Sequence, residues 1–407
     1  MNYQNKFDAE TQLKISPFFD RTSKLNESQE WRRWAGYLSA TNYELTHDNE
    51  YFAIRTKAAL LDITPLKKYL VEGPDAQRFL DRLVTRNIAI CKIGQVMYTP
   101  WCDEDGNQID DGTVQRLSEN KFRITSAEPN LEWLLHNSEN MDVDIKDDSL
   151  KTAALALQGP NSRDILNEIS SDSLNDLKFF WMMNTTFDEI PVSISRTGYT
   201  GDLGYEIWLN PNDALSVWDM LNNKGKSFGI TPTGLHALDI SRIEAGLILL
   251  DVDYISSRHA IIKNRKSTPY ELGLGWAVKM NKKDFIGKRA LELEQNPKWR
   301  FIGIEIDWDG LESHFRDVGL PPGLPPTAWR TSTPLYKDNK QIGYATSGTW
   351  SPILKKYIAL AHVKSDYSQN GTQLHFELKV EHFRKLTPAK VVNTPFFDPE
   401  RKRSCPQ

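Results

Sequence analysis

The sequence has few cysteines, no long apolar segment and no excess of basic charge. Its three cysteines, Cys91, Cys102 and Cys405, are too few for a disulfide framework, and they do not form the paired Cys-x-x-Cys pattern of a zinc site. We therefore expect reduced thiols and no metal. No apolar run approaches the roughly 18 residues that a membrane-spanning helix needs, so no membrane partner is expected.

The charge of the chain is nearly balanced, with 50 Lys and Arg against 54 Asp and Glu and a formal net charge of −4. This balance argues against the broad basic surface that binds nucleic acid, and a small-molecule partner fits better. The first residues, Met-Asn-Tyr-Gln-Asn-Lys-Phe, lack the basic-then-apolar order of a secretory signal. We therefore expect a cytoplasmic protein.

Length and local patterns predict several packed units. A chain of 407 residues is too long for one ordinary core. Residues 68–84 have the pattern of a strand, a Gly-Pro turn and an amphipathic helix, and residues 153–166 show the same order again. Between them, residues 94–125 contain short strand-like segments joined by polar turns, which is typical of an antiparallel sheet.

Three other segments have patterns of their own. Apolar spacing predicts a helix from about residue 49 to residue 59. Residues 307–330, which contain Gly-Leu-Pro-Pro-Gly-Leu-Pro-Pro, predict an irregular loop that is neither helix nor strand. Residues 334–392 alternate β-prone segments with turns and predict a small β-barrel or sandwich.

The densest group of acidic residues lies at 103–111, Asp-Glu-Asp-Gly-Asn-Gln-Ile-Asp-Asp. A Ca²⁺ loop, a solvated turn and a positioned catalytic acid all fit such a cluster. The Ca²⁺ interpretation fails because the carboxylate at its twelfth position and the flanking helices are missing. Since Asp110 and Asp111 lie between Ile109 and Thr113, at least one carboxylate should lie at a strand end beside the core. The residues alone leave the solvated turn and the catalytic acid both open.

Other catalytic patterns are missing or weak. The eight histidines are scattered and no Gly-x-Ser-x-Gly elbow occurs, so no Ser-His-Asp or Cys-His arrangement is proposed, and His236 and His259 are expected to be structural. Residues 198–204, Gly-Tyr-Thr-Gly-Asp-Leu-Gly, lack the Gly-Lys-Ser/Thr ending of a phosphate loop. They predict a hairpin or a loop that contacts a ligand.

Eight segments in the same order resemble the aminomethyltransferase family of the glycine cleavage T protein and its relatives, the folate-dependent demethylases. Two carry the most distinctive motifs, Gly-Asn-Gln-Ile-Asp-Asp at 106–111 and Ser-Arg-Thr-Gly-Tyr-Thr-Gly-Asp-Leu-Gly-Tyr-Glu at 195–206. The resemblance runs through nearly the whole chain. The other segments are 53–63, 157–160, 242–245, 274–279, 284–288 and 346–352.

The resemblance implies an α+β fold built as a three-domain ring. Two related α+β units with antiparallel sheets and a C-terminal β-barrel would surround a central channel that binds tetrahydrofolate. Residues 1–150 would form the N-terminal folate-binding domain, 151–295 the second α+β domain that completes the channel, and 296–407 the barrel domain.

The resemblance also implies roles for five residues. Asp111 matches the second acid of the family's Asp-Asp pair, and it is expected to be the catalytic carboxylate beside the folate nitrogens. Tyr98 matches the aromatic residue upstream of the pair, and Ser126 matches a polar position near the ligand. Tyr199 and Glu206 match positions that face the pterin, whose guanidine-like edge suits a carboxylate and whose ring suits a tyrosine.

The implied function is a tetrahydrofolate-dependent transferase that moves an aminomethyl or methyl unit from an N-, S- or O-linked donor to tetrahydrofolate. Leu238 stands where T proteins usually have Arg, and Pro65 ends an Asp-Ile-Thr-Pro segment where they have Asp-Val-Ser-His. These departures favour a free methylated compound over the aminomethyl-lipoyl arm of a carrier protein. The alternative is a non-catalytic folate-binding accessory protein of the iron–sulfur maturation type, whose Lys-x-Cys-Tyr-x-Gly-Gln segment is absent here.

Overall fold

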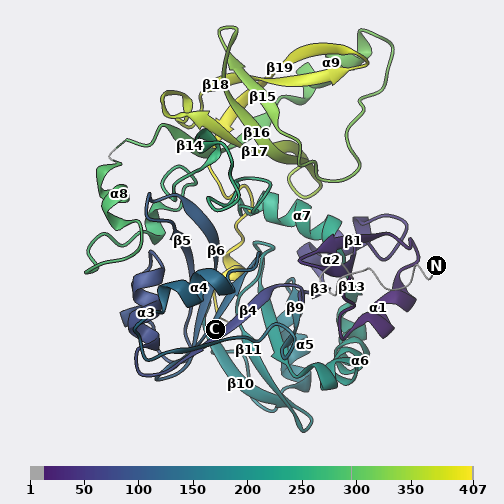
Figure 1. Cartoon of the computed structure of the whole chain (residues 1–407). Helices are drawn as coiled ribbons and strands as arrows, with labels where there is room; N and C mark the ends of the chain where they lie inside the picture. The colour runs from purple at the N-terminus through teal and green to yellow at the C-terminus, as the bar shows by residue number, and fades with distance from the viewer. Residues whose placement is uncertain (1–12, 295, 406–407) are drawn as a thin grey trace, which may run out of the picture.

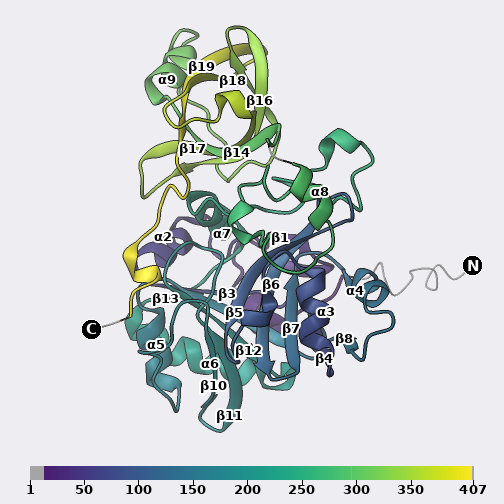
Figure 2. The ribbon, with the colours of Figure 1, turned by 90° about the vertical axis from the view of Figure 1, so that its left-hand side faces the viewer.

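The computed structural model describes residues 13–294 and 296–405, which are organised around three large β-sheets (Figure 1). A five-stranded and a six-stranded sheet lie beside each other, and a closed barrel lies beyond them in both views (Figure 2). The predicted α+β fold with two sheet units and a C-terminal barrel is confirmed. The domain limits at residues 150 and 295 stay a prediction.

The five-stranded sheet is antiparallel throughout and packs one face on helices α3 (Ala76–Leu83) and α4 (Leu131–Asn137). Phe79 and Leu80 of α3 meet Trp101 and Phe122 of the sheet in a fully buried core. The strands, in spatial order, are β5 (Val96–Cys102), β6 (Gln108–Ser118), β7 (Lys121–Ser126), β4 (Lys67–Glu72) and β8 (Asp144–Asp147).

The six-stranded sheet is covered by helices on both faces. Helices α5 (Ser162–Ile169) and α6 (Ala214–Gly225) pack on one face, and α2 (Asp48–Thr56) and α7 (Leu235–Glu244) pack on the other. The strands, in spatial order, are β10 (Met182–Phe187), β11 (Ile190–Ser195), β12 (Gly204–Leu209), β9 (Ala153–Gln158), β3 (Ala58–Asp62) and β13 (Ile230–Pro232). The sheet differs from the expected antiparallel one at a single place, because β13 pairs parallel with β3.

The repeated strand, turn and helix is confirmed, since β4 leads into α3 and β9 leads into α5. For the helix predicted at residues 49–59, the predicted C-terminal end was wrong. Helix α2 stops at Thr56, and Ala58 and Ala59 begin β3 because they are fully buried in the sheet and Ala59 pairs with Gln158. The five-stranded sheet is therefore inserted between two adjacent strands of the six-stranded one, β3 and β9.

The predicted C-terminal barrel is closed by antiparallel pairs, with β14 joined to both β17 and β19. Part of residues 307–330 was wrongly predicted as irregular, since α9 (Trp308–Arg316) forms there. The Asp307 carboxylate accepts a hydrogen bond from the backbone N of Gly310, and Leu311 and Phe315 are buried in the barrel core. The strands are β14 (Trp299–Ile306), β17 (Lys356–Lys364), β16 (Lys340–Ser351), β15 (Thr333–Lys337), β18 (Gln373–Val380) and β19 (Phe383–Val392).

The remaining elements are short. A two-stranded hairpin near the N-terminus precedes α2, and α8 leads toward the barrel (Figure 1). These elements are α1 (Phe19–Leu25), β1 (Trp31–Trp34), β2 (Tyr37–Ala40) and α8 (Lys288–Leu293), with 3₁₀ turns at Ile88–Ile90, Pro211–Asp213, Lys226–Phe228, Lys263–Arg265, Gly275–Ala277, Ser365–Tyr367 and Glu400–Lys402.

A buried ionic cluster joins the six-stranded sheet and its helices to the barrel. Arg55 of α2 donates to Glu244 of α7 at 2.6 Å and to Asp202 at 3.4 Å, and all three side chains are fully buried. Glu244 also accepts from the hydroxyls of Tyr51 and of Ser351 in the barrel, each at 2.5 Å. The cluster thus ties α2 and α7 to strand β16.

The C-terminal segment runs from the barrel back to the six-stranded sheet, as the yellow trace in Figure 2 shows. Arg401 binds the Asp202 carboxylate at 2.7 and 2.8 Å, and the buried Arg196 donates to the carbonyl oxygen of Ser404 at 2.6 Å. Within the described ranges, no helix is long and apolar enough to cross a membrane. The same residues contain no group of three or more His, Cys, Asp and Glu side chains that could hold a metal ion.

Candidate functional site

Asp111 lies on β6 with its carboxylate held by two tyrosines. The hydroxyl of Tyr98 on the neighbouring strand β5 donates to Oδ2 at 2.8 Å. The hydroxyl of Tyr254, from the irregular segment after α7, donates to Oδ1, and Gln108 Nε2 lies 3.4 Å from the same oxygen. The carboxylate is therefore fixed from both sides by donors.

The strand geometry separates Asp111 from its neighbour Asp110. Successive side chains of a strand point to opposite faces of the sheet. Asp110 is 1 % exposed, and its carboxylate accepts from the backbone N of Asp111 and from Asn130 Nδ2, both at 2.8 Å. Asp111 keeps an accessible surface. Asp110 therefore supports the strand, while Asp111 is available to a ligand.

The other acids of the cluster lie in the turn between β5 and β6. Asp103 caps this turn by accepting from the backbone N of Asn107 at 2.9 Å, while Glu104 and Asp105 are exposed. These three residues form the solvated turn that the sequence left open, and Asp111 lies beyond it on the strand. Gly112 follows because β6 and β7 approach closely there: a Cβ at this position would lie 1.9 Å from the carbonyl oxygen of Thr125.

The electrostatics of this pair differ from those of exposed acids. Burial raises the pKa of Asp111, whereas the hydrogen bonds from Tyr254 and Tyr98 lower it and so partly offset the burial. Burial and the nearby charge of Asp111 raise the pKa of Asp110 well above its usual value. Burial and the charge of Asp111 also raise the pKa of Tyr98 and of Tyr254, which keeps both hydroxyls protonated as donors.

Glu206 lies on β12 of the six-stranded sheet, where a chain of hydroxyls holds it. Thr197 Oγ1 donates to Glu206 Oε2 at 2.6 Å, Ser195 Oγ lies 2.8 Å from Thr197 Oγ1, and Trp208 Nε1 donates to Ser195 at 3.1 Å. Burial raises the pKa of Glu206, and the nearby hydroxyls of Thr197 and Ser195 lower it. Only one carboxylate oxygen, Oε2, receives a donor at hydrogen-bond distance from the described residues.

The other two predicted residues have different surroundings. The Tyr199 hydroxyl donates to the backbone carbonyl of Ile248. Burial and the charge of Asp111 raise the pKa of Tyr199, so this hydroxyl lies within the electrostatic influence of the Asp111 carboxylate. Ser126 is buried, and its hydroxyl donates to the carbonyl oxygen of Glu128 at 2.7 Å. The structure thus brings Tyr98, Asp111 and Tyr199 together. Ligand contact by Ser126 stays a prediction.

Three residues near Asp111 were not predicted as site residues. Tyr254 and Gln108 both reach its carboxylate, and Trp276, which is 54 % exposed, stacks on Tyr98 with ring centroids 6.0 Å apart. Gln108 precedes Asp111 by three residues, so the acidic segment already contained it. Tyr254 follows Asp111 by 143 residues, and no local pattern connects them.

Comparisons with known proteins give consistent matches. The family model described as the GCVT N-terminal domain matches residues 20–282, and the glycine cleavage T-protein C-terminal barrel domain matches residues 316–398. An aminomethyltransferase of Halothermothrix orenii is 36 % identical over 95 % of this chain and 100 % of its own length. One of Bacillus pumilus is 35 % identical over 86 % of this chain and 89 % of its own length.

A solved structure matches over the same extent. The glycine cleavage system aminomethyltransferase T from Bartonella henselae superimposes with a TM-score of 0.80 at 27 % sequence identity. The match covers 95 % of this chain and 99 % of that one. Both sheet units and the barrel therefore have counterparts in one protein of similar length.

Proposed function

Because the chain belongs to the glycine cleavage T-protein family, we propose that it is a tetrahydrofolate-dependent aminomethyltransferase with Asp111 as its catalytic carboxylate. The observation that carries this proposal is the Asp111 carboxylate itself, which is desolvated and fixed by Tyr98 and Tyr254. A non-catalytic accessory role is not favoured, since the relatives named above are aminomethyltransferases.

The polar atoms around the site suit a folate. Gln108 Oε1 and Arg242 Nη2 are buried and have no hydrogen-bond partner among the described residues, which leaves one acceptor and one donor unpaired. Buried polar atoms without a partner are uncommon, and a polar ligand is one way to satisfy them. The Oε1 atom of Glu206 would accept from the guanidine-like edge of the pterin. Tyr98 and Tyr199 would lie beside its ring.

The protein residues would act on the transfer by holding and neutralising charge. Tetrahydrofolate supplies the amine nitrogen that accepts the one-carbon unit. Asp111 would accept a hydrogen bond from that amine and stabilise the positive charge that develops on it during transfer. Tyr98 and Tyr254 would keep the carboxylate in one orientation, which fixes the distance between the reacting groups.

The proposed donor carries an aminomethyl unit on a lipoyl arm. The relatives named above support this choice, because they are aminomethyltransferases. Leu238 and Pro65 still favour a free methylated donor, so the donor class needs its own test. We also propose a cytoplasmic location, which the unpaired Cys91 and Cys102 suit.

The direct test is a transfer assay with tetrahydrofolate and two donors. An aminomethyl-lipoyl carrier should give 5,10-methylene-tetrahydrofolate and ammonia, whereas a free methylated amine that donates its methyl group would give 5-methyl-tetrahydrofolate. The folate product identifies the donor class. Absence of tetrahydrofolate binding by calorimetry would refute the proposed function altogether.

Replacing Tyr254 with Phe is expected to shift the acidic limb of the kcat profile to higher pH and to lower kcat by roughly tenfold. The change removes a donor that lowers the Asp111 pKa, so this pKa rises. Since the ionised carboxylate is the active form, activity is then lost at a higher pH as the solution is acidified. The pH dependence of kcat measures the shift, and an unchanged profile would show that Tyr254 does not act on Asp111.

Replacing Glu206 with Gln is expected to weaken tetrahydrofolate binding by about 10- to 100-fold, because an amide offers one acceptor in place of a charged carboxylate. The Thr197 hydroxyl can still donate to the amide oxygen, so the fold should tolerate the change. Calorimetry gives the dissociation constant. Glu189→Gln, on an exposed turn of the same sheet, is the matched control and should bind as the original chain does.

A further inference from the structure

A cation of the five-stranded sheet lies over an aromatic ring of the six-stranded sheet. The guanidinium carbon of Arg123, on β7, is 5.3 Å from the centre of the Trp208 ring, on β12. Trp208 is 2 % exposed, and a cation is attracted more strongly to a desolvated ring face than to an exposed one. This contact joins the sheet that carries Asp111 to the sheet that carries Glu206.

Both members of the contact lie on the sheet faces of the candidate site. Arg123 is paired with Gln115, and side chains alternate along β6, so Arg123, Gln115 and Asp111 share one face of the five-stranded sheet. Trp208 follows Glu206 by two residues on β12, so these two side chains share a face as well. A change at Arg123 or Trp208 can therefore act on the site without contact to a ligand.

Arg123 forms no ion pair with a carboxylate of the described residues. Its Nη1 donates to Gln115 Oε1 at 3.2 Å, while its buried Nε has no hydrogen-bond partner there. Burial lowers the pKa of Arg123 and the more distant Asp148 raises it, and burial and Arg123 lower the pKa of Lys68 on β4. The Trp208 ring thus supplies part of the stabilisation that an ion pair would otherwise give.

A chain of hydrogen bonds leads from Trp208 to Glu206, and its direction is fixed. An indole N–H can only donate, so Ser195 Oγ accepts from Trp208 Nε1, at 3.1 Å. Thr197 uses its proton for Glu206 Oε2, at 2.6 Å, so the proton between the Ser195 and Thr197 hydroxyls comes from Ser195. Every bond of the chain therefore points toward the carboxylate.

This direction opposes protonation of the Glu206 oxygen that ends the chain. If Oε2 carried a proton and donated to Thr197, then Thr197 would donate to Ser195. The Ser195 hydroxyl would then have no acceptor in the chain, because the indole offers none, and a buried donor without an acceptor is unfavourable. A cation over the indole ring polarises its N–H and strengthens the whole chain.

The groups around Glu206 agree with this role of the chain. Burial raises the pKa of Glu206, and the hydroxyls of Thr197 and Ser195 are the groups of the described residues that lower it. The charged groups of the facing sheet near Trp208 are Arg123 and Lys68, and neither forms an ion pair with Glu206. The hydroxyls therefore do what a cation does beside other buried carboxylates.

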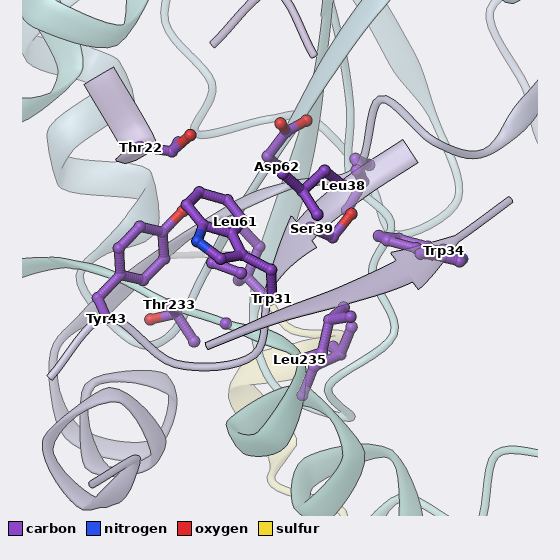
Figure 3. A pocket seen from close by; sticks show the side chains of 14 residues that line it. Thr22, Trp31, Trp34, Leu38, Ser39, Tyr43, Leu61, Asp62, Thr233 and Leu235 are labelled. Carbon is purple, nitrogen blue, oxygen red and sulfur yellow. The ribbon is translucent and has the colours of Figure 1, made fainter. Parts of the chain in front are cut away.

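Glu206 is also where a ligand has room on this sheet face. A small cavity lies on the same face beneath the β1–β2 hairpin, where Leu61 and Trp34 line it (Figure 3). Leu61 pairs with Ala156, which pairs with Glu206, so the cavity and Glu206 belong to one row of side chains. Its volume of about 20 Å³ holds about one water molecule and no pterin. On this face, the pterin is therefore expected at Glu206.

We propose that Arg123 and Trp208 are positioning residues for folate binding, which act through Ser195 and Thr197 to hold the Glu206 carboxylate as an acceptor for the pterin. This inference rests on the proposed function, in which Glu206 binds the pterin. It gives the five-stranded sheet a second task, because this sheet both carries Asp111 and supports the ligand-binding acid of the other sheet.

Trp208→Phe keeps an aromatic ring in contact with Arg123 and removes the N–H donor. We expect this variant to bind tetrahydrofolate roughly three- to tenfold more weakly, while kcat at saturating folate stays unchanged because the Asp111 contacts are intact. The chain lowers the Glu206 pKa, so breaking it raises this pKa, and affinity is lost at a higher pH as the solution is acidified. Calorimetry at several pH values measures both effects.

The same change in a Glu206→Gln background separates positioning from packing. Without the carboxylate, Trp208→Phe should cause little further loss of tetrahydrofolate affinity, because the two residues act as one unit. An undiminished loss in this background would assign the effect to packing and would overturn the proposal.

Arg123→Met tests the other end of the chain. It removes the cation and should weaken tetrahydrofolate binding roughly threefold, and Arg123→Lys, which keeps a cation, should restore the affinity. Arg116→Met is the matched control, because Arg116 lies 5.2 Å from the Phe122 ring on the helix-covered face of the same sheet, and it should bind as the original chain does. If Trp208→Phe does not fold by circular dichroism, unchanged affinity of a folded Arg123→Met overturns the proposal.

A titration without folate separates this proposal from the proposed function. Carbon-13 NMR of the Glu206 carboxyl, assigned with Glu206→Gln, should show a higher pKa in Trp208→Phe than in the original chain. An equal pKa in the two would overturn the proposal. Absence of tetrahydrofolate binding by the original chain would instead refute the proposed function, and the titration would still decide whether the chain acts on Glu206.

Discussion

Changing Asp111 to Asn is expected to lower kcat by about 10²- to 10³-fold with little change in tetrahydrofolate affinity. The amide keeps the size of the side chain: its oxygen can accept from one of the two tyrosines, and its NH2 group can donate to the hydroxyl oxygen of the other, so the geometry of the site should survive. What is lost is the negative charge that would stabilise the folate amine as positive charge develops. Steady-state kinetics at saturating tetrahydrofolate measure the effect.

The control for Asp111→Asn is Asp105→Asn, in the exposed turn of the same hairpin. It makes the same chemical change six residues away, and its kcat should equal that of the original chain. Turnover of Asp111→Asn equal to that of this control would remove Asp111 from the mechanism. A loss confined to KM would instead assign Asp111 to folate binding alone.

Replacing Arg55 with Met is expected to lower the free energy of unfolding by about 3 to 5 kcal/mol. The change leaves the fully buried Glu244 carboxylate without its cation, while Asp202 keeps Arg401. It also removes the contact of the guanidinium with the Phe397 ring, whose centroid lies 4.6 Å from it. Denaturant unfolding followed by circular dichroism gives the stability difference.

Arg21→Met provides the comparison for Arg55→Met. Arg21 also binds a carboxylate, that of Asp219, through two nitrogens at 2.8 and 2.7 Å, but the two side chains are 35 % and 43 % exposed. Water can hydrate the carboxylate that remains, so the loss should stay below about 1 kcal/mol. If both variants lost the same stability, burial would not be the reason for the importance of Arg55.

The sequence pattern predicted the general position of the proposed catalytic carboxylate but could not choose between two neighbours. Flanking apolar residues indicated that Asp110 or Asp111 lies beside the core, and only the family resemblance selected Asp111. The structure supplies a physical reason. Because side chains alternate along the strand, Asp110 points to one face of the sheet and accepts a hydrogen bond from Asn130, whereas Asp111 points to the other face and accepts from two tyrosines. Local spacing carries no information on which face of the sheet is covered.

Contacts between distant segments cannot be predicted from local sequence patterns. Tyr254 reaches Asp111 from an irregular segment, where neither helical nor strand periodicity exists to orient a side chain. The end of α2 was misplaced for a related reason, since Ala58 and Ala59 suit a helix by propensity but pair within a buried sheet. The α9 helix was not predicted because the prolines that follow it indicate an irregular loop, and this interpretation was extended to all of residues 307–330.

The place of β3 in the sheet has a consequence for how this chain folds. β3 must pair with β9, and the register joins Asp62 to Leu155, so the whole five-stranded sheet is synthesised between the two partners. Contacts between residues so far apart in sequence are made late and slow the rate of folding. As the chain leaves the ribosome, one edge of β3 therefore stays unpaired until β9 has emerged, and the other until β13 has emerged. Unpaired strand edges of this kind favour aggregation during synthesis.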